Sequence, residues 1–194
     1  MKFEEKTSTP TVAHVCVPYL QATETFIYDR IAHPQWPHHP QWPRHPQRFR
    51  SVVATNEPVI HRDLFPHPAV STMADRPALV RKANAAWQRW FGYSPWYLGA
   101  LRREGAGVIH AHYGPVGCSV LRVKEKLRLP LMTSFYGQDA SALLRDPRYE
   151  REYRRLFARC EMISVLSEDM KSRMIDAGCP PERIAIHHLA VDTD

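Results

Sequence analysis

Two short apolar runs near the middle of the chain are each followed by a polar, glycine-containing turn. The runs span residues 108–111 and 131–135, and between them the apolar residues of segment 116–129 recur at helical spacing. This pattern predicts a strand–helix–strand unit, and in an open parallel sheet ligands bind beyond the carboxyl ends of the strands. We therefore expect one candidate site to gather the residues of both turns: His112, Tyr113, Gly114, Tyr136, Gly137 and Asp139.

Both turns offer groups that can hold a phosphate or a sugar hydroxyl. Gly114 and Pro115 open the predicted helix, where free backbone amides can receive an anion. Gly137 follows a strand and leaves room for a ligand beside the carboxylate of Asp139. Tight turns without a ligand are the alternative. Two such turns on consecutive strands, each with hydrogen-bonding neighbours, favour a site.

Histidines and aspartates elsewhere in the chain give weaker signals. Strand alternation places His110 and His112 on one side of their strand, which is compatible with a packed, hydrogen-bonded pair and with a site. Asp192 and Asp194 form a D-x-D triplet, but three residues are too short a signal for a cation site. The sequence has no Walker A motif, no G-x-S-x-G turn and no H-E-x-x-H zinc helix. We expect no metal site.

Apolar runs alternate with segments of helical periodicity along the chain, which predicts an α/β fold with a Rossmann-like, doubly wound parallel sheet. Thr23 suits the N-cap of the first helix, with Glu24 in its first turn, and Ser167 suits the N-cap of the last. The expected strands are 12–17, 50–55, 108–111, 131–135, 162–166 and 184–187, with a short strand at 59–61 inside a loop at 57–73. The expected later helices are 75–91, 94–104, 116–129, 139–144, 147–158 and 168–177.

Residues 33–47 repeat the motif H-P-Q-W-P, with a proline every two or three positions that excludes a helix. We interpret this segment as a low-complexity, polyproline-like surface insert between the first helix and the second strand. Metal binding by its histidines is the alternative, although no fold fixes their geometry.

The composition limits the partners of the chain. Its 194 residues, 44% hydrophobic and 24% charged, suit one globular domain, and no apolar run approaches the ~20 residues that span a bilayer. The net charge of +6 attracts phosphates and anionic lipids. No RNP or helix-turn-helix motif is present, so we exclude nucleic acid as a partner. The four scattered cysteines are expected to be buried, reduced thiols in the cytosol.

Aromatic and basic residues gather in the second half of the first hundred residues. They suit either ordinary packing or, if exposed together, contact with a membrane surface. The residues concerned are Trp87, Trp90, Trp96 and Tyr97, with Arg81, Lys82 and Arg89.

Four blocks of the sequence resemble, in order, the N-terminal half of a family 4 glycosyltransferase of the GT-B fold. They are T-E-T-F-I-Y at 23–28, I-H-A-H-Y-G-P-V-G at 109–117, S-F-Y-G-Q-D at 134–139, and 165–192 with V-L-S-E-D-M and L-A-V-D. Members that build bacterial surface polysaccharides are the most similar. The resemblance covers nearly the whole chain apart from the insert and residues 57–90.

The resemblance implies a Rossmann-like acceptor-side domain that faces a second domain across a cleft. That second domain binds a nucleotide-sugar donor, a co-substrate, and the sugar passes with retention to a sugar or lipid-linked acceptor, without a cofactor or essential metal. Tyr136 and His112 are the implied catalytic candidates, and Tyr136 stands where many members have a histidine. The implied substrate-binding residues are Thr23, Glu24, Thr25, Tyr113, Gly114, Gly137 and Asp139.

The sequence ends where the resemblance places the start of the donor domain. We therefore expect residues 1–194 to form a single domain without that donor domain, inactive alone, cytoplasmic, with peripheral contact at the inner face of the membrane as an option. A non-catalytic binding or assembly module derived from a glycosyltransferase half is the alternative.

Overall fold

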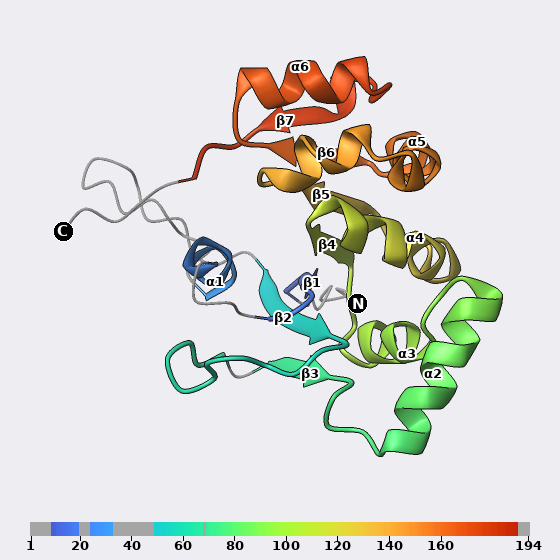
Figure 1. Ribbon diagram of the computed structural model, residues 1–194. Coiled ribbons are helices and arrows are strands. Elements are labelled where there is room, and N and C mark those ends of the chain that lie inside the picture. Colours follow the sequence, from blue (N-terminus) through green and yellow to red (C-terminus); the bar gives the residue numbers. More distant parts are fainter. Residues whose placement is uncertain (1–8, 20–23, 33–48, 68, 190–194) are drawn as a thin grey trace, which may run out of the picture.

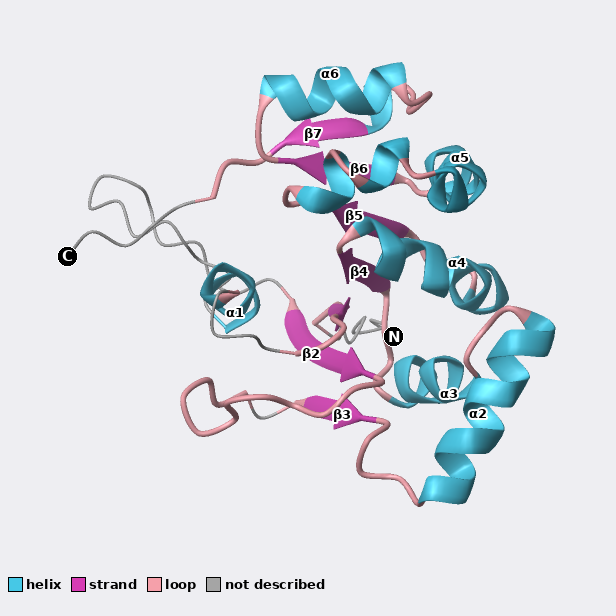
Figure 2. Cartoon of the chain, in the orientation of Figure 1, coloured by secondary structure: helices cyan, strands magenta, loops and turns pink. Residues whose placement is uncertain are grey.

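A seven-stranded, fully parallel sheet forms the centre of the molecule, with strand order β3-β2-β1-β4-β5-β6-β7. The computed structural model describes residues 9–19, 24–32, 49–67 and 69–189. Helix α1 lies on one side of the sheet, and helices α2 to α5 lie on the other (Figures 1 and 2). This is the predicted doubly wound, Rossmann-like arrangement, and the strand order reverses between β1 and β4.

The elements have the following bounds. The strands are β1 (Thr11–Val15), β2 (Arg50–Thr55), β3 (Val70–Thr72), β4 (Val108–His112), β5 (Leu131–Ser134), β6 (Met162–Val165) and β7 (Ile184–Ile186). The α-helices are α1 (Thr25–Ala32), α2 (Ala78–Phe91), α3 (Pro95–Arg103), α4 (Gly114–Leu127), α5 (Pro147–Arg159) and α6 (Glu168–Asp176). Short 3-10 turns are η1 (Gln138–Ala140), η2 (Leu143–Arg145) and η3 (Pro181–Arg183).

Six predicted strands and most predicted helices are confirmed, but two predictions within the loops are wrong. The third strand is β3, not 59–61, where Val59 makes only an isolated bridge to Tyr19. The helix predicted at 139–144 is two 3-10 turns, η1 and η2. The Ser167 cap is confirmed, because its hydroxyl accepts from the amide of Met170 at 3.2 Å. Thr23, the repeat at 33–47 and the triplet ending at Asp194 lie outside the described residues.

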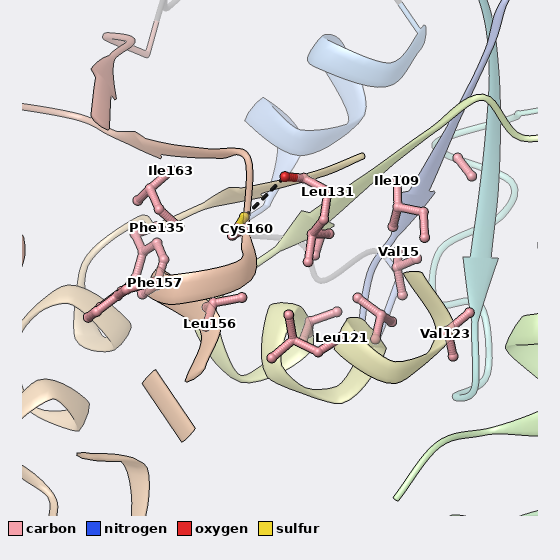
Figure 3. Close-up of a cluster of buried hydrophobic side chains, with 14 of the residues drawn as sticks. Val15, Ile109, Leu121, Val123, Leu131, Phe135, Leu156, Phe157, Cys160 and Ile163 are labelled. Atoms are coloured by element: carbon pink, nitrogen blue, oxygen red, sulfur yellow. Dashed lines mark hydrogen bonds between the residues drawn. The ribbon is translucent and has the colours of Figure 1, made fainter. Parts of the chain in front are cut away.

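The larger apolar core lies between the sheet and helices α3, α4 and α5. Strand residues such as Ile109 and Leu131 meet helix residues such as Leu156, all almost fully buried (Figure 3). Cys160, at the end of α5, donates from its thiol to the carbonyl of Leu131 at 3.1 Å. All four cysteines are unpaired, and three of them are buried.

The opposite face of the sheet is partly polar. Ile27 and Ile31 of α1 pack in a second apolar cluster with Cys16, beyond β1, and Val53 of β2. Strand alternation brings three histidines to the same side, and all three are buried: His14, His110 and His112. His14 and His110 are register partners in the β1–β4 pair. The polar side chains are thus concentrated at the strands where the sheet order reverses.

Helix α2 has no buried residue, so its apolar side chains remain exposed. Trp87 and Trp90 are exposed as expected for a surface stripe, but Tyr97 is buried and Trp96 packs on the core. The stripe is therefore confined to α2. No helix in the described part of the chain is long and apolar enough to cross a bilayer.

Candidate functional site

Asp139 joins the turns that follow β4 and β5. Its Oδ2 accepts a hydrogen bond from the amide of Gly114 at 3.0 Å. Its Oδ1 accepts from the amides of Tyr136 and Gly137, each at 3.0 Å. The side chain is 2% exposed, so the carboxylate is a structural link between two neighbouring strand ends. The two glycine turns expected to meet at one edge of the sheet do lie together.

Tyr113 connects these turns to the start of α1. Its hydroxyl donates to Oε1 of Glu24 at 2.8 Å, and Glu24 directly precedes the first residue of α1. The backbone of Tyr113 has a φ of 76°, a region that L-residues seldom occupy. Such conformations cost of order 1–3 kcal/mol and concentrate at functional sites. The strained tyrosine therefore marks this corner of the molecule as a candidate for ligand contact.

Tyr136 contacts an imidazole and two aromatic rings. Its hydroxyl lies 2.7 Å from Nδ1 of His112. Its ring is 5.0 Å from that of Tyr113, edge-on, and 4.9 Å from that of Phe26 in α1. Phe26 was not among the predicted site residues, although its place inside the T-E-T-F-I-Y block is a signal that could have found it. These contacts hold the phenol beside the two turns.

The hydrogen bonds continue inward from His112 to a residue that the sequence interpretation missed. Nε2 of His112 lies 3.1 Å from Nδ1 of His14, and Nε2 of His110 lies 2.8 Å from the hydroxyl of Ser134. His14 stands inside an apolar strand run, where a single histidine attracts no attention. The signal that could have found it is the parallel register that pairs β1 with β4.

Burial keeps the inner histidines neutral. It lowers the pKa of His14 to about 3, and it lowers the pKa of His110 and His112 well below the usual value. The neighbouring histidines and the Arg30 guanidinium lower the pKa values of His110 and His112 further. Burial also raises the pKa of the Tyr136 phenol, which therefore stays protonated at neutral pH. Tyr136 and His112 therefore share a hydrogen bond, but neither is poised to take up or release a proton near neutral pH.

Burial raises the pKa of the Asp139 carboxyl, and this effect exceeds the opposing one of its backbone hydrogen bonds. Because its oxygens already accept three amide protons, the carboxylate has little remaining capacity to bind a ligand or to act as a base.

The exposed part of this site is smaller than the predicted set of residues. Thr25 and Gly137 are exposed, and a Cβ placed on Gly137 meets no atom within 4 Å. Tyr113 and Tyr136 are half-buried. We call this surface, comprising Thr25, Tyr113, Tyr136, Gly137 and the underlying Asp139, the Asp139 rim. His112 lies beneath it and is fully buried.

Gly114 does not have the role expected for it. Its amide, expected to receive a phosphate, is occupied by Asp139. A Cβ at this position would lie 2.4 Å from Cε1 of Phe135 and 2.6 Å from the hydroxyl of Tyr153. Glycine is therefore needed here for close packing of α4 against its neighbours, not for the approach of a ligand.

A match between this chain and the sequence profile of a protein family decides which family the chain belongs to. The profile of Glycosyltransferase Family 4 matches residues 29–194, which is most of the chain. The chain belongs to glycosyltransferase family 4. The resemblance drawn from the four sequence blocks is thereby confirmed.

Relatives named for polysaccharide synthesis match this family 4 chain over part of their length. The colanic acid biosynthesis glycosyltransferase WcaL of Salmonella typhimurium is 36% identical over 89 residues, which are 45% of this chain and 22% of WcaL. The amylovoran biosynthesis glycosyltransferase AmsK of Erwinia amylovora is 26% identical over 91 residues, 46% of this chain and 22% of AmsK.

Solved structures share the fold. Anabaena HepE, crystallised with UDP and glucose, has a TM-score of 0.63 at 13% identity, over 94% of this family 4 chain and 45% of HepE. The UDP-N-acetylglucosamine 2-epimerase of Rickettsia bellii has a TM-score of 0.55 at 12% identity, over 92% of this chain and 44% of the epimerase. The chain thus spans a little under half of each of these two structures. The likeness shows the Rossmann-like GT-B fold.

Proposed function

We propose that this chain forms the acceptor side of a glycosyltransferase that builds a bacterial surface polysaccharide. A second domain, corresponding to the part of HepE that this chain does not cover, binds the nucleotide-sugar donor as co-substrate. The sugar passes, with retention, to a polysaccharide or lipid-linked acceptor held at the Asp139 rim, without a cofactor. The polymers named for WcaL and AmsK support this class of acceptor.

The observation that carries the proposal is the bridge made by Asp139. It holds the turn amides of Gly114, Tyr136 and Gly137, and so joins two strand ends at the carboxyl edge of the sheet. Ligands of open α/β sheets bind at this edge, near the point where the strand order reverses. The open space at Gly137 leaves room for a sugar ring against the backbone.

The chemistry available at the rim is hydrogen bonding. The protonated phenol of Tyr136 donates to a hydroxyl of the transferred sugar or of the acceptor, and His112 holds that phenol in position from below. Neither group gains or loses a proton near neutral pH, because the pKa of Tyr136 is raised and that of His112 is lowered. Stabilisation of the departing nucleotide therefore has to come from preorganised donors of the second domain.

A chimera tests this function. Residues 1–194 are joined to the C-terminal half of Salmonella WcaL, and transfer of a radiolabelled sugar from nucleotide-sugar donors to lipid-linked acceptors is measured. We expect transfer, and we expect Tyr136→Phe to reduce its rate by about 100-fold, as for loss of one preorganised donor. Tyr149→Phe, on the half-buried face of α5, is the control and should change little. A folded chimera that binds donor but transfers nothing contradicts the proposal.

We further propose that helix α2 brings the chain to the membrane that carries a lipid-linked acceptor. Leu79 and Trp90 are 80% and 81% exposed, and Trp87 and Phe91 add further exposed apolar surface. The same helix carries three basic side chains and no acidic one: Arg81, Lys82 and Arg89. Aromatic residues with basic neighbours suit the interface of an anionic membrane.

A further inference from the structure

The imidazoles of His14, His110 and His112 form a cluster that the proposed sugar transfer does not use. One nitrogen of each ring can be chosen so that all three lie within 4.8 Å of one another. The centroids of the His110 and His112 rings are 4.3 Å apart, and those of His14 and His110 are 5.1 Å apart. Among the described residues this is the one group of three such side chains close enough to share an ion.

The hydrogen bonds within the cluster leave it incomplete. His14 shares one contact, from Nδ1 to Nε2 of His112, and its Nε2 is buried without a partner among the described residues. A buried polar atom without a partner costs about 1–3 kcal/mol. His14 is thus held in the cluster by a single contact, the one between its Nδ1 and Nε2 of His112.

The backbone register and the chemistry of the three imidazoles favour a metal ion over other ligands. Strand pairing fixes the backbones that carry the histidines, because His14 and His110 are partners in the register and His112 follows two residues later. Neutral imidazole nitrogens bind late first-row divalent ions, and a set of three leaves one position of a tetrahedral ion for water or hydroxide. The 3.1 Å between the facing nitrogens of His14 and His112 also suits two ligands of one ion.

We propose that His14, His110 and His112 form a zinc site beneath the Asp139 rim. The proposal goes beyond sugar transfer and does not depend on it. A structural consequence follows for Tyr136. When Nε2 of His112 binds the ion, its Nδ1 must carry the proton and donate to the Tyr136 oxygen, 2.7 Å away. The phenol then has its own proton free to donate outward at the rim.

The test is metal titration of the purified full chain. Zinc chloride is titrated in competition with a chromophoric chelator, and cobalt chloride is used for its visible absorption. Because the histidines of the 33–47 repeat can also bind metal, the protein carries His38→Gln and His39→Gln as a background that removes two of them. We expect one zinc per chain and the absorption bands of tetrahedral cobalt in this background.

Variants then assign the site to its residues. In the same background, His14→Gln and His110→Gln should each weaken zinc binding by about 100-fold or more, beyond the 10- to 100-fold typical of outer-shell changes. Circular dichroism checks the fold of each variant. If both variants unfold, X-ray absorption of the zinc-loaded background protein replaces them and should show imidazole nitrogens at about 2.0 Å. Absence of zinc binding, or binding that the cluster variants leave unchanged, overturns the proposal.

Discussion

At the scale of single residues, the geometry of the rim depends on Asp139. Replacing it by alanine leaves the amides of Gly114, Tyr136 and Gly137 without their acceptor. We expect Asp139→Ala to lower the free energy of unfolding by about 2–4 kcal/mol. Hydrogen bonds to a charged acceptor are worth about 1.5–3 kcal/mol each, and relief of the cost of burying the carboxylate offsets part of the loss of three. Denaturant unfolding measures the change. Asp75→Ala, at an exposed aspartate, is the control, and an equal loss in both variants would contradict the structural role of Asp139.

The buried histidines make stability depend on pH. Their pKa values are lower in the folded chain than the unfolded value of 6.5, so the unfolded state binds more protons below that pH. The free energy of unfolding is therefore highest above pH 6.5 as far as these histidines decide it. It falls as the pH decreases towards about 3, the folded pKa of His14. We expect a loss of about 1.4 kcal/mol per histidine between pH 7.5 and pH 5.5.

Urea unfolding at several pH values measures this dependence, and the His14→Gln variant should show a shallower decrease. A free energy of unfolding that stays constant down to pH 5 would mean that these imidazoles are protonated at no cost in the folded chain.

Sequence reasoning identified the strand ends but not how each residue acts there. It predicted that His110 and His112 share one side of β4, because alternation alone decides this. It could not predict the hydrogen bond between Gly114 and Asp139, because that contact joins residues 25 positions apart through a tertiary arrangement. His14 was not predicted as a site residue for the same reason, because the histidines beside it come from another strand.

At the scale of elements, two glycines in helices separate packing from helix propensity. A Cβ at Gly117 in α4 would lie 2.6 Å from Oγ1 of Thr133, whereas a Cβ at Gly99 in α3 meets nothing within 4 Å. We expect Gly117→Ala to destabilise the fold by about 1–3 kcal/mol through overpacking. Gly99→Ala should stabilise it by about 0.5–1 kcal/mol. Thermal unfolding compares the two, and a stabilised Gly117→Ala would show that α4 is not in close contact with the sheet.

Helix α2 provides a separate prediction. The chain should sediment with vesicles containing phosphatidylglycerol and not with pure phosphatidylcholine vesicles, because its basic residues require an anionic surface. Trp90→Ser together with Leu79→Ser should reduce the bound fraction several-fold. Leu64→Ser, which removes a side chain that is 68% exposed outside α2, should not. Equal binding by all variants would remove α2 from the membrane contact.

The elements were predictable where a strong local signal defined them. Ser167 and the periodicity of 116–129 gave α6 and α4 close to their observed bounds. Strand β3 has only three residues, and its pairing with β2 rather than its composition makes it a strand. Segment 139–144 is apolar enough for a helix. However, the carboxylate of Asp139 accepts hydrogen bonds from the amides of residues 136 and 137, and the segment forms two short 3-10 turns instead.

At the scale of the whole molecule, the strand order places the reversal between β1 and β4, next to the predicted β4–β5 turns. The alternation of apolar runs with segments of helical periodicity was enough to predict this class of fold. The chain covers 45% of HepE, and under the proposed function it forms the acceptor side of a cleft between two domains. The acceptor should therefore bind here, and the nucleotide sugar should not.

Nuclear magnetic resonance of the isotope-labelled chain tests this claim most directly. Oligosaccharide fragments of bacterial surface polysaccharides and nucleotide sugars are titrated in separate experiments, and backbone amide shifts are mapped. We predict that an acceptor fragment shifts the amides of Thr25, Tyr113 and Gly137, and that nucleotide sugars shift none of them at micromolar concentrations. Shifts at these residues with a nucleotide sugar, or acceptor shifts confined to α4 and α5, would contradict the account.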